Sequence, residues 1–326
     1  MQNQDVATTG VARVCSSRGE RARVLWESQE FEALVRSALL HGGGIVPVTG
    51  DWVAVRQLDQ GTLLIEEVLP RKSKIARRAA GRDGQEQVLA ANVDMAFLVA
   101  GLDGDFNVRR LERYLAIVYD GGVQPVVVLN KSDMCADIGA AVSKANGVAG
   151  TARVLVASAE TGAGVDAIVE LLKPGITAVL LGSSGAGKST LLNRIVGWDA
   201  HRTNAVRAGD SRGQHTTTER ELISLPCGAA LIDTPGLREI QLLVGAGALD
   251  AVFDEIAVLA ADCRFADCTH AMEPDCAVRG AVSADRLASF QKLRRETARL
   301  TTTVTEKHRW RAMHKAARRF YKDRNR

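Results

Sequence analysis

The chain has 326 residues, of which 46% are hydrophobic and 25% charged, a composition typical of an ordinary globular protein with two or three domains. Its net charge of +4 is too small for a polycation, but residues 307–326 hold nine Lys or Arg and one acid, so the rest of the chain is net negative. No run approaches the roughly 18 apolar residues of a membrane span, and the first ten residues do not resemble a signal peptide, so we expect a cytoplasmic protein that contacts no membrane.

Residues 10–70 contain short β-type runs, at 21–26, 52–55 and 63–68, separated by glycine-containing turns. Short strands with closely spaced turns predict a small β-barrel or sandwich. The segment that follows, 71–82, has six basic residues and no acid. We interpret it either as a solvated connector or as a loop that contacts phosphates.

Beyond residue 90, apolar runs at 93–100, 125–129, 154–157 and 176–181 alternate with helical patterns at 108–119 and 165–172. This alternation predicts an α/β domain with a mainly parallel sheet, helices on both faces and chemistry at the carboxyl ends of the strands. The polar stretch 199–218 predicts a long, mobile, functional loop. An apolar helix at 248–261 and a helical stretch from Ser283 lead to the basic tail.

A phosphate-binding pattern, GxxxxGK[ST], follows the apolar run 176–181 and precedes a helix that begins near Lys188. Its glycines allow backbone N–H groups to surround a phosphate, Lys188 reaches the β and γ phosphates, and Ser189 is a ligand of Mg²⁺. The predicted phosphate site comprises Gly182, Ser183, Ser184, Gly185, Ala186, Gly187, Lys188, Ser189 and Thr190.

Two further motifs end strands of the same predicted sheet. Asp233 in DTPG follows the run 229–232 as an acid on the Mg²⁺ side, and Gly236 is free to approach the γ-phosphate. The NKSD motif, Asn130, Lys131, Ser132 and Asp133, follows the run 125–129. The Asp133 carboxylate accepts two donors that guanine has and adenine lacks, while backbone N–H groups at Ser158 and Ala159 face guanine O6.

The order of these motifs differs from that of an ordinary small GTPase, in which the phosphate loop comes first and NKxD late. Here NKSD at 130 and SAE at 158 precede the phosphate loop at 182, TTT at 216–218 and DTPG at 233. A sheet tolerates such a circular permutation because chain termini in a compact domain often lie close together.

A cysteine cluster follows the predicted GTPase region. Cys263, Cys268, His270 and Cys276 supply three thiolates and one imidazole within 14 residues, enough to complete a tetrahedral Zn²⁺ shell without an open position. Six cysteines are too few for a disulfide scaffold, and the segment has too few apolar residues to fold around its own core, so we predict one structural zinc ion per chain.

Taken together, these features resemble the bacterial ribosome small-subunit-dependent GTPase A family. The resemblance rests on the permuted motifs and on GDWV at 50–53, RKSKIAR at 71–77, QVLAANVDMAFLV at 87–99, GQHTTT at 213–218 and CRFADCTHAMEPDCAV at 263–278. It implies an N-terminal OB-fold barrel at 1–80, a circularly permuted P-loop GTPase domain at 81–246, and a C-terminal zinc-binding helical domain with a basic tail at 247–326.

The same resemblance suggests the residues of hydrolysis. Thr217 is the expected switch I ligand of Mg²⁺ and the γ-phosphate, although Thr216 and Thr218 remain alternatives. His215 is a candidate for positioning the attacking water, because Leu237 stands after DTPG where many GTPases have a glutamine, and an apolar side chain cannot orient water. An alternative is that His215 has no catalytic duty.

We therefore expect a monomeric GTP hydrolase that uses Mg²⁺, binds ribosomal RNA, acts in late maturation of the small ribosomal subunit and is stimulated by that subunit. The barrel, the 71–82 stretch and the tail, with Trp310, Phe320 and Tyr321 among its cations, would contact RNA phosphates. Two alternatives are an ATPase with an incidental NKSD, and an RNA-binding module that senses GTP with negligible turnover.

Overall fold

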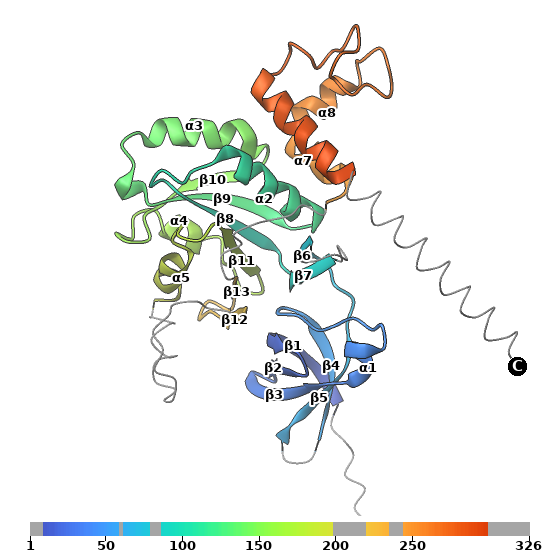
Figure 1. The fold of residues 1–326 in the computed structure, drawn as a ribbon. Coiled ribbons are helices and arrows are strands. Elements are labelled where there is room, and N and C mark those ends of the chain that lie inside the picture. Colours follow the sequence, from blue (N-terminus) through green and yellow to red (C-terminus); the bar gives the residue numbers. More distant parts are fainter. Residues whose placement is uncertain (1–8, 59–60, 79–85, 198–219, 235–243, 299–326) are drawn as a thin grey trace, which may run out of the picture.

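The computed structural model describes residues 9–58, 61–78, 86–197, 220–234 and 244–298, which form three regions along the chain (Figure 1). A small barrel comes first, a sheet covered by helices follows, and a helical region carrying the cysteine cluster comes last. No helix in these described ranges is long and apolar enough to cross a membrane.

The first region is a closed barrel with the strand order β1-β2-β3-β5-β4. Strand β3 pairs in parallel with β5, and the other neighbours pair antiparallel, an arrangement typical of the OB-fold. Alternate side chains such as Val24 of β2 and Ile65 of β5 point into the core because successive strand residues face opposite sides. The elements are β1 Thr9–Arg18, β2 Arg21–Trp26, β3 Gln29–Val35, α1 Ser37–His41, β4 Trp52–Gln57 and β5 Leu63–Val68.

A β-hairpin connects the barrel to the sheet. Strand β6, Lys74–Arg78, pairs antiparallel with β7, Glu86–Ala91. Residues Lys74–Arg78 are thus a strand and not a solvated connector or a loop, whereas phosphate contact by the 71–82 stretch stays a prediction. The many charged side chains of this segment give no apolar pattern from which a strand could be predicted. Its apolar residue Ile75 is nevertheless fully buried against the core of the second region.

The second region is built on a six-stranded sheet with the order β10-β9-β8-β11-β13-β12. All neighbours are parallel except the edge strand β12, which runs antiparallel to β13. Every residue of β11 is buried, as expected for a central strand covered on both faces. The strands are β8 Met95–Gly101, β9 Gln124–Asn130, β10 Arg153–Val156, β11 Thr177–Gly182, β12 Glu221–Ser224 and β13 Ala230–Asp233.

Two separate apolar cores lie on the two faces of this sheet. Helices α2, Val108–Asp120, and α3, Ile138–Ala149, contribute to one core, whereas α4, Asp166–Val169, and α5, Lys188–Val196, contribute to the other. The predicted helix 165–172 is thus only one turn of α-helix. The predicted α/β architecture with helices on both faces is confirmed.

The permutation is visible in the strand order. Strand β11, which leads into the phosphate loop, is fourth of the six in the chain but lies inside the sheet, between β8 and β13. Consequently β8, β9 and β10, which precede it in the chain, all lie to one side of β11, and β12 and β13, which follow it, lie to the other.

In the third region, the predicted helix 248–261 is divided into α7, Ala246–Val252, and α8, Asp254–Ala260. The chain turns at Phe253, whose side chain is fully buried against Phe290 at 5.3 Å between ring centroids. Residues 284–298 are helical, in agreement with the helix expected from Ser283.

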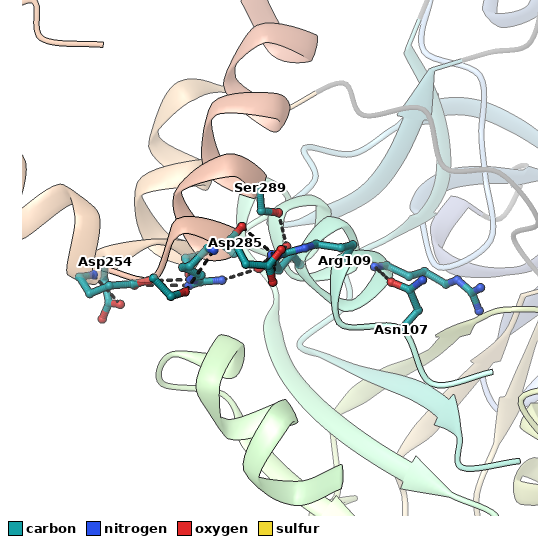
Figure 2. A network of polar contacts seen from close by, with 11 residues as sticks. Asn107, Arg109, Asp254, Asp285 and Ser289 are labelled. Carbon is teal, nitrogen blue, oxygen red and sulfur yellow. Dashed lines mark hydrogen bonds and ion pairs between the residues drawn. The ribbon is translucent and has the colours of Figure 1, made fainter. Parts of the chain in front are cut away.

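A buried polar network joins this region to α2 (Figure 2). Glu112 of α2 is fully buried and accepts hydrogen bonds from Arg286 Nη1 at 2.7 Å, from Arg109 Nη1 at 2.9 Å and from the Ser289 hydroxyl. Arg286 also donates to Glu255 Oε1 at 2.6 Å. A charge removed from water is tolerated only when paired in this way, so the network requires the C-terminal helix to dock on α2.

The barrel contacts the sheet region through backbone and side-chain hydrogen bonds. Arg13 of β1 donates from Nη2 to the Asn92 carbonyl and to the Thr177 hydroxyl, both at 3.1 Å. Gly50 has φ +91°, and a Cβ there would lie 2.2 Å from the Ala91 carbonyl oxygen, so only glycine allows the two backbones to approach this closely.

Candidate functional site

The predicted nucleotide motifs meet at one edge of the six-stranded sheet. Asn130, Gly182 and Asp233 are the last residues of β9, β11 and β13, and Ser158 follows the end of β10. Because these strands are parallel, their carboxyl ends lie together, as sequence analysis predicted.

The phosphate loop connects β11 to α5, and at two of its glycines a side chain would clash with neighbouring atoms. Gly187 has φ +88° directly before α5, and a Cβ there would lie 2.3 Å from Asn130 Nδ2. Gly182 has φ +158°, and a Cβ there would lie 2.3 Å from the Val99 carbonyl oxygen. Both positions therefore require glycine for packing.

Lys188 is buried, and its Nζ donates to the carbonyl oxygens of Gly182 at 3.0 Å and Ser183 at 2.7 Å. Burial lowers the pKa of Lys188, whereas the carboxylate of Asp233 acts to raise it. The ammonium is thus held above the loop where phosphates would enter. Ser189 and Thr190, in the first turn of α5, are exposed and accessible.

Asn130 links the phosphate loop to the predicted base site. Its Nδ2 donates to the Ala186 carbonyl at 2.9 Å, and its Oδ1 accepts from the Ala159 amide at 2.9 Å. The side chain is buried, so both bonds are protected from water. One side chain therefore sets the distance between the two halves of the nucleotide site.

The predicted guanine-reading residues also converge. The Ser158 hydroxyl donates to Asp133 Oδ1 at 2.5 Å and accepts from the Thr161 amide at 3.1 Å. Asp133 itself is exposed, so its remaining lone pairs can meet a ligand. Lys131 has φ +61°, a left-handed conformation that ends β9 and turns the chain into the single helical turn Ser132–Met134.

Asp233 is buried at the end of β13, directly opposite Leu180 of β11. The next residue, Thr234, donates its hydroxyl to the Leu180 carbonyl at 2.6 Å. The DTPG motif thus begins next to β11, the strand that leads into the phosphate loop. This is the position expected for an acid, here Asp233, on the Mg²⁺ side of a nucleotide.

Two acidic residues that sequence analysis missed also lie at this edge, in the loop between β8 and α2. Asp105 Oδ2 accepts from the Ser183 hydroxyl at 2.7 Å and from Arg110 Nη1 at 2.6 Å. Asp103 pairs with Lys131 Nζ. The sequence signal for them is only partial: the loop follows the apolar run 93–100, so its acids are expected at the carboxyl edge of a sheet, but their approach to the phosphate loop depends on β8 lying next to β11.

Several predicted residues lie outside the described ranges: His215, Thr216, Thr217, Thr218, Gly236 and Leu237, the loop 199–218 and the tail 307–326. Their predicted roles remain predictions. The described residues contain the phosphate loop, the NKSD motif, Ser158, Ala159 and Asp233.

The cysteine cluster gathers as predicted. The ligand atoms of Cys263, Cys268, His270 and Cys276 all lie within 4.8 Å of one another. Cys263 Sγ lies 3.9 Å from Cys276 Sγ and 3.6 Å from His270 Nδ1. Tetrahedral zinc bonds of about 2.3 Å to sulfur and 2.0 Å to nitrogen imply separations of roughly 3.8 Å and 3.5 Å. The donor set therefore fits zinc, with Nδ1 as the histidine ligand.

The neighbours of this cluster hold its ligands in place. The Arg279 amide donates to Cys276 Sγ at 3.4 Å, and Gln291 Nε2 donates to the His270 carbonyl at 2.9 Å. Contacts of this kind orient metal ligands. Because Gln291 belongs to the helix 284–298, the cluster is attached to the same helix that docks on α2.

Comparison with known proteins gives two family-model matches, "RsgA GTPase" over residues 68–243 and "50S ribosome-binding GTPase" over residues 177–315. A curated relative from Opitutus terrae, "Small ribosomal subunit biogenesis GTPase RsgA", is 45% identical over 93% of this chain and 86% of its own length. The chain belongs to the RsgA GTPase family. As a member of this family it is a GTPase, which supports guanine over the ATPase alternative and implies the use of Mg²⁺.

Two solved structures share the fold of this chain. YjeQ from Thermotoga maritima superimposes with a TM-score of 0.66 at 25% identity, covering 89% of this chain and 99% of that one. YloQ, described as a circularly permuted GTPase, has a TM-score of 0.63 at 20% identity, covering 91% and 98%. The second supports the fold alone, including the permuted order derived above.

Proposed function

We propose that this RsgA-family GTPase acts in late maturation of the small ribosomal subunit, binds ribosomal RNA, and hydrolyses GTP faster when the subunit is bound. The names of its curated relatives support the biological role. The observation that supports the chemistry best is the buried side chain of Asn130, which joins the phosphate loop to the Ser158–Ala159 turn and so couples phosphate binding to guanine recognition.

In the proposed nucleotide site, the Ser158 hydroxyl holds the carboxylate of Asp133. This carboxylate accepts hydrogen bonds from N1–H and from the 2-amino group of guanine. Ala159 offers its backbone to the base edge, and Lys131 covers the ring plane. The phosphate loop surrounds the phosphates with backbone amides. The proposed nucleotide ligands are Asn130, Lys131, Ser132, Asp133, Ser158, Ala159, Gly182, Ser183, Ser184, Gly185, Ala186, Gly187, Lys188, Ser189, Thr190, Asp233 and Gly236.

For hydrolysis, Lys188 exchanges its own loop carbonyls for the β and γ phosphates and neutralises charge as the bond to the leaving group lengthens. Ser189 and Thr217 are the proposed protein ligands of Mg²⁺, with Asp233 on the same side. When bound with GTP, Mg²⁺ neutralises charge on the β and γ oxygens. His215 is the proposed group that positions the attacking water, because Leu237 has no polar atom for this purpose.

The remaining parts of the proposal concern organisation. We place the domain boundaries at 1–80, 81–246 and 247–326, with the hairpin β6–β7 spanning the first of them. Cys263, Cys268, His270 and Cys276 would hold one structural zinc ion, which substitutes for a hydrophobic core in that segment. The proposed state is a cytoplasmic monomer.

The test is multiple-turnover release of phosphate from GTP by the full chain, with and without purified small ribosomal subunits. We expect slow intrinsic turnover and strong stimulation by subunits. His215→Ala should retain binding to subunits with a non-hydrolysable GTP analogue and lose the stimulation. Equal turnover with and without subunits would contradict the proposed role, and negligible turnover in both would favour the GTP-sensing alternative.

A further inference from the structure

A cavity of about 370 Å³ lies at the junction between the barrel and the sheet region. The barrel contributes Ser17 and Arg18 at the end of β1 and Val48 and Thr49 before β4, and the sheet side contributes Leu89 of β7 and Arg220. This volume lies within the range of small-ligand pockets, about 300–1,000 Å³. A hydrogen bond from the Thr49 hydroxyl to the Arg220 carbonyl, at 3.2 Å, connects the barrel to the sheet region beside the cavity.

The cavity is cationic. Arg18 and Arg220 both line it, and no carboxylate is among its described lining residues. Arg77 of β6 lies near enough to add repulsion: burial, and then the charge of Arg77, lowers the pKa of the Arg220 guanidinium. Holding the partly buried Arg220 close to the like charge of Arg77 is unfavourable unless an anion offsets the repulsion.

Arg220 also has an unused donor. Its Nε is buried, and no acceptor among the described residues lies within hydrogen-bonding distance of it. A buried donor without a partner costs about 1–3 kcal/mol, so Arg220 is held at this junction at a cost that an anion close to its guanidinium would offset.

Two nearby carboxylates already pair with other arginines. Glu221, the neighbour of Arg220, pairs with Arg23 of β2. Asp51, beside Thr49, is fully buried and accepts two hydrogen bonds from Arg71 at 2.7 Å. These two carboxylates are therefore unavailable to Arg220.

We propose that this cavity binds a phosphate group, with the guanidinium of Arg220 as its central donor and Arg18 on the barrel side. A guanidinium presents forked donors that match phosphate oxygens, and the Ser17 hydroxyl offers a further donor. The phosphate can belong to an RNA backbone or to a small free phosphate compound. The RNA source rests on the proposed function.

The test compares three variants of the full chain with one control. Arg220→Met and Arg18→Met remove the donors but keep most of the unbranched apolar stem, whereas Arg220→Lys keeps the charge without the forked donors. Arg153→Met is the control, because Arg153 is an exposed arginine on β10, at the opposite edge of the same sheet from β12. Thermal unfolding midpoints of all four variants check folding.

The first arm measures binding of purified small ribosomal subunits, with a non-hydrolysable GTP analogue, over a series of salt concentrations. If the phosphate is on RNA, Arg220→Met should weaken binding roughly tenfold. It should also reduce the slope of log K against log salt by about 1. Arg18→Met should act in the same direction, Arg220→Lys should recover part of both effects, and Arg153→Met should match the parent protein.

The second arm measures thermal stabilisation of the GDP-loaded chain by inorganic phosphate and pyrophosphate. GDP occupies the nucleotide site, so stabilisation that Arg220→Met abolishes would assign the cavity to a free phosphate compound. The proposal is overturned if Arg220→Met and Arg18→Met equal the parent in both arms. A parent protein that does not bind subunits would contradict the proposed function instead, while the second arm would still test the cavity.

Discussion

At the residue scale, guanine selection should depend on Asp133. Asp133→Asn replaces an acceptor by an amide, so it should weaken GTP binding by about 1.5–3 kcal/mol, the contribution of a hydrogen bond to a charged group. It should improve binding of xanthosine triphosphate, which carries a carbonyl in place of the 2-amino group. Competition of both nucleotides and ATP against a fluorescent guanine nucleotide measures the change.

Ser158→Ala is the matched control for that substitution. It removes the hydroxyl that holds Asp133 Oδ1 but leaves the carboxylate in place. We expect weaker GTP binding without a gain for xanthosine triphosphate. An Asp133→Asn protein that still prefers GTP over both other nucleotides would show that another residue reads the base.

Asp105 is expected to position the phosphate loop. Hydrogen bonds from Arg110 and then Ser183 hold the pKa of Asp105 below its usual value, so the carboxylate is ionised at neutral pH and keeps the Ser183 hydroxyl. Asp105→Ala should weaken GDP binding roughly threefold to tenfold, the effect of one hydrogen bond. Asp105→Asn keeps an acceptor and should lose less. Equal GDP affinities of both variants and the parent in fluorescence titrations would rule out this role.

At the scale of elements, α2 and the C-terminal helix are joined by the buried Glu112. Glu112→Ala removes the buried acceptor shared by Arg286, Arg109 and Ser289 and leaves Arg286 paired with Glu255 alone, so it should cost about 3 kcal/mol and lower the thermal midpoint of the C-terminal region. Arg56→Gln is the control, because its ion pair with Glu66 is on the barrel surface and should be worth about 1 kcal/mol or less. Similar midpoints for both variants would contradict the importance of the network.

The cysteine cluster gives a second prediction at this scale. We expect one zinc ion per chain, lost in Cys276→Ser or on chelation, with increased proteolysis of 263–282 and GDP binding largely retained. Retention is expected because the nucleotide motifs end strands of the sheet, apart from the cluster. Cys227→Ser is the matched control, since Cys227 is an exposed cysteine outside the cluster. Metal analysis that finds no stoichiometric zinc in the parent would remove the assignment.

At the scale of the whole molecule, binding to subunits should depend on salt if, as proposed, the basic segments contact RNA phosphates whatever the base sequence. Residues 315–326, which lie outside the described ranges, hold six Lys or Arg against one acid. Their deletion should weaken subunit binding and flatten its salt dependence while leaving intrinsic GTP hydrolysis intact. Unchanged salt dependence in sedimentation assays would place the RNA contacts elsewhere.

The larger arrangement of the molecule was only partly readable from its sequence. The apolar runs 21–26 and 63–68 are strands with the expected bounds, because alternation or continuous burial leaves a local signal. Strand β6 was missed because five of the eight residues 71–78 are basic, three of them within the strand, and only its docking against the sheet region buries Ile75. Helix α4 is shorter than its apolar pattern indicated, since that pattern continues into turns that also face the core.

The sequence by itself determined the chemistry that depends on local spacing. A phosphate loop needs its glycines and lysine at fixed positions in one short loop, and a zinc site of this kind has its ligands within a short segment. Both can therefore be recognised as sequence motifs. The relative order of NKSD and the phosphate loop likewise indicates the permutation from the sequence alone.

Only the tertiary structure decided the contacts that cross the sheet or the domain junctions. Asp105 meets Ser183 from 78 residues away, and Glu112 meets Arg286 from 174 residues away. Arg220 joins Arg18 only because β12 lies at the edge of the sheet that faces the barrel strand β1. Such pairs depend on strand order and domain docking, which bring residues together by burial over the whole molecule and leave no periodic pattern along the chain.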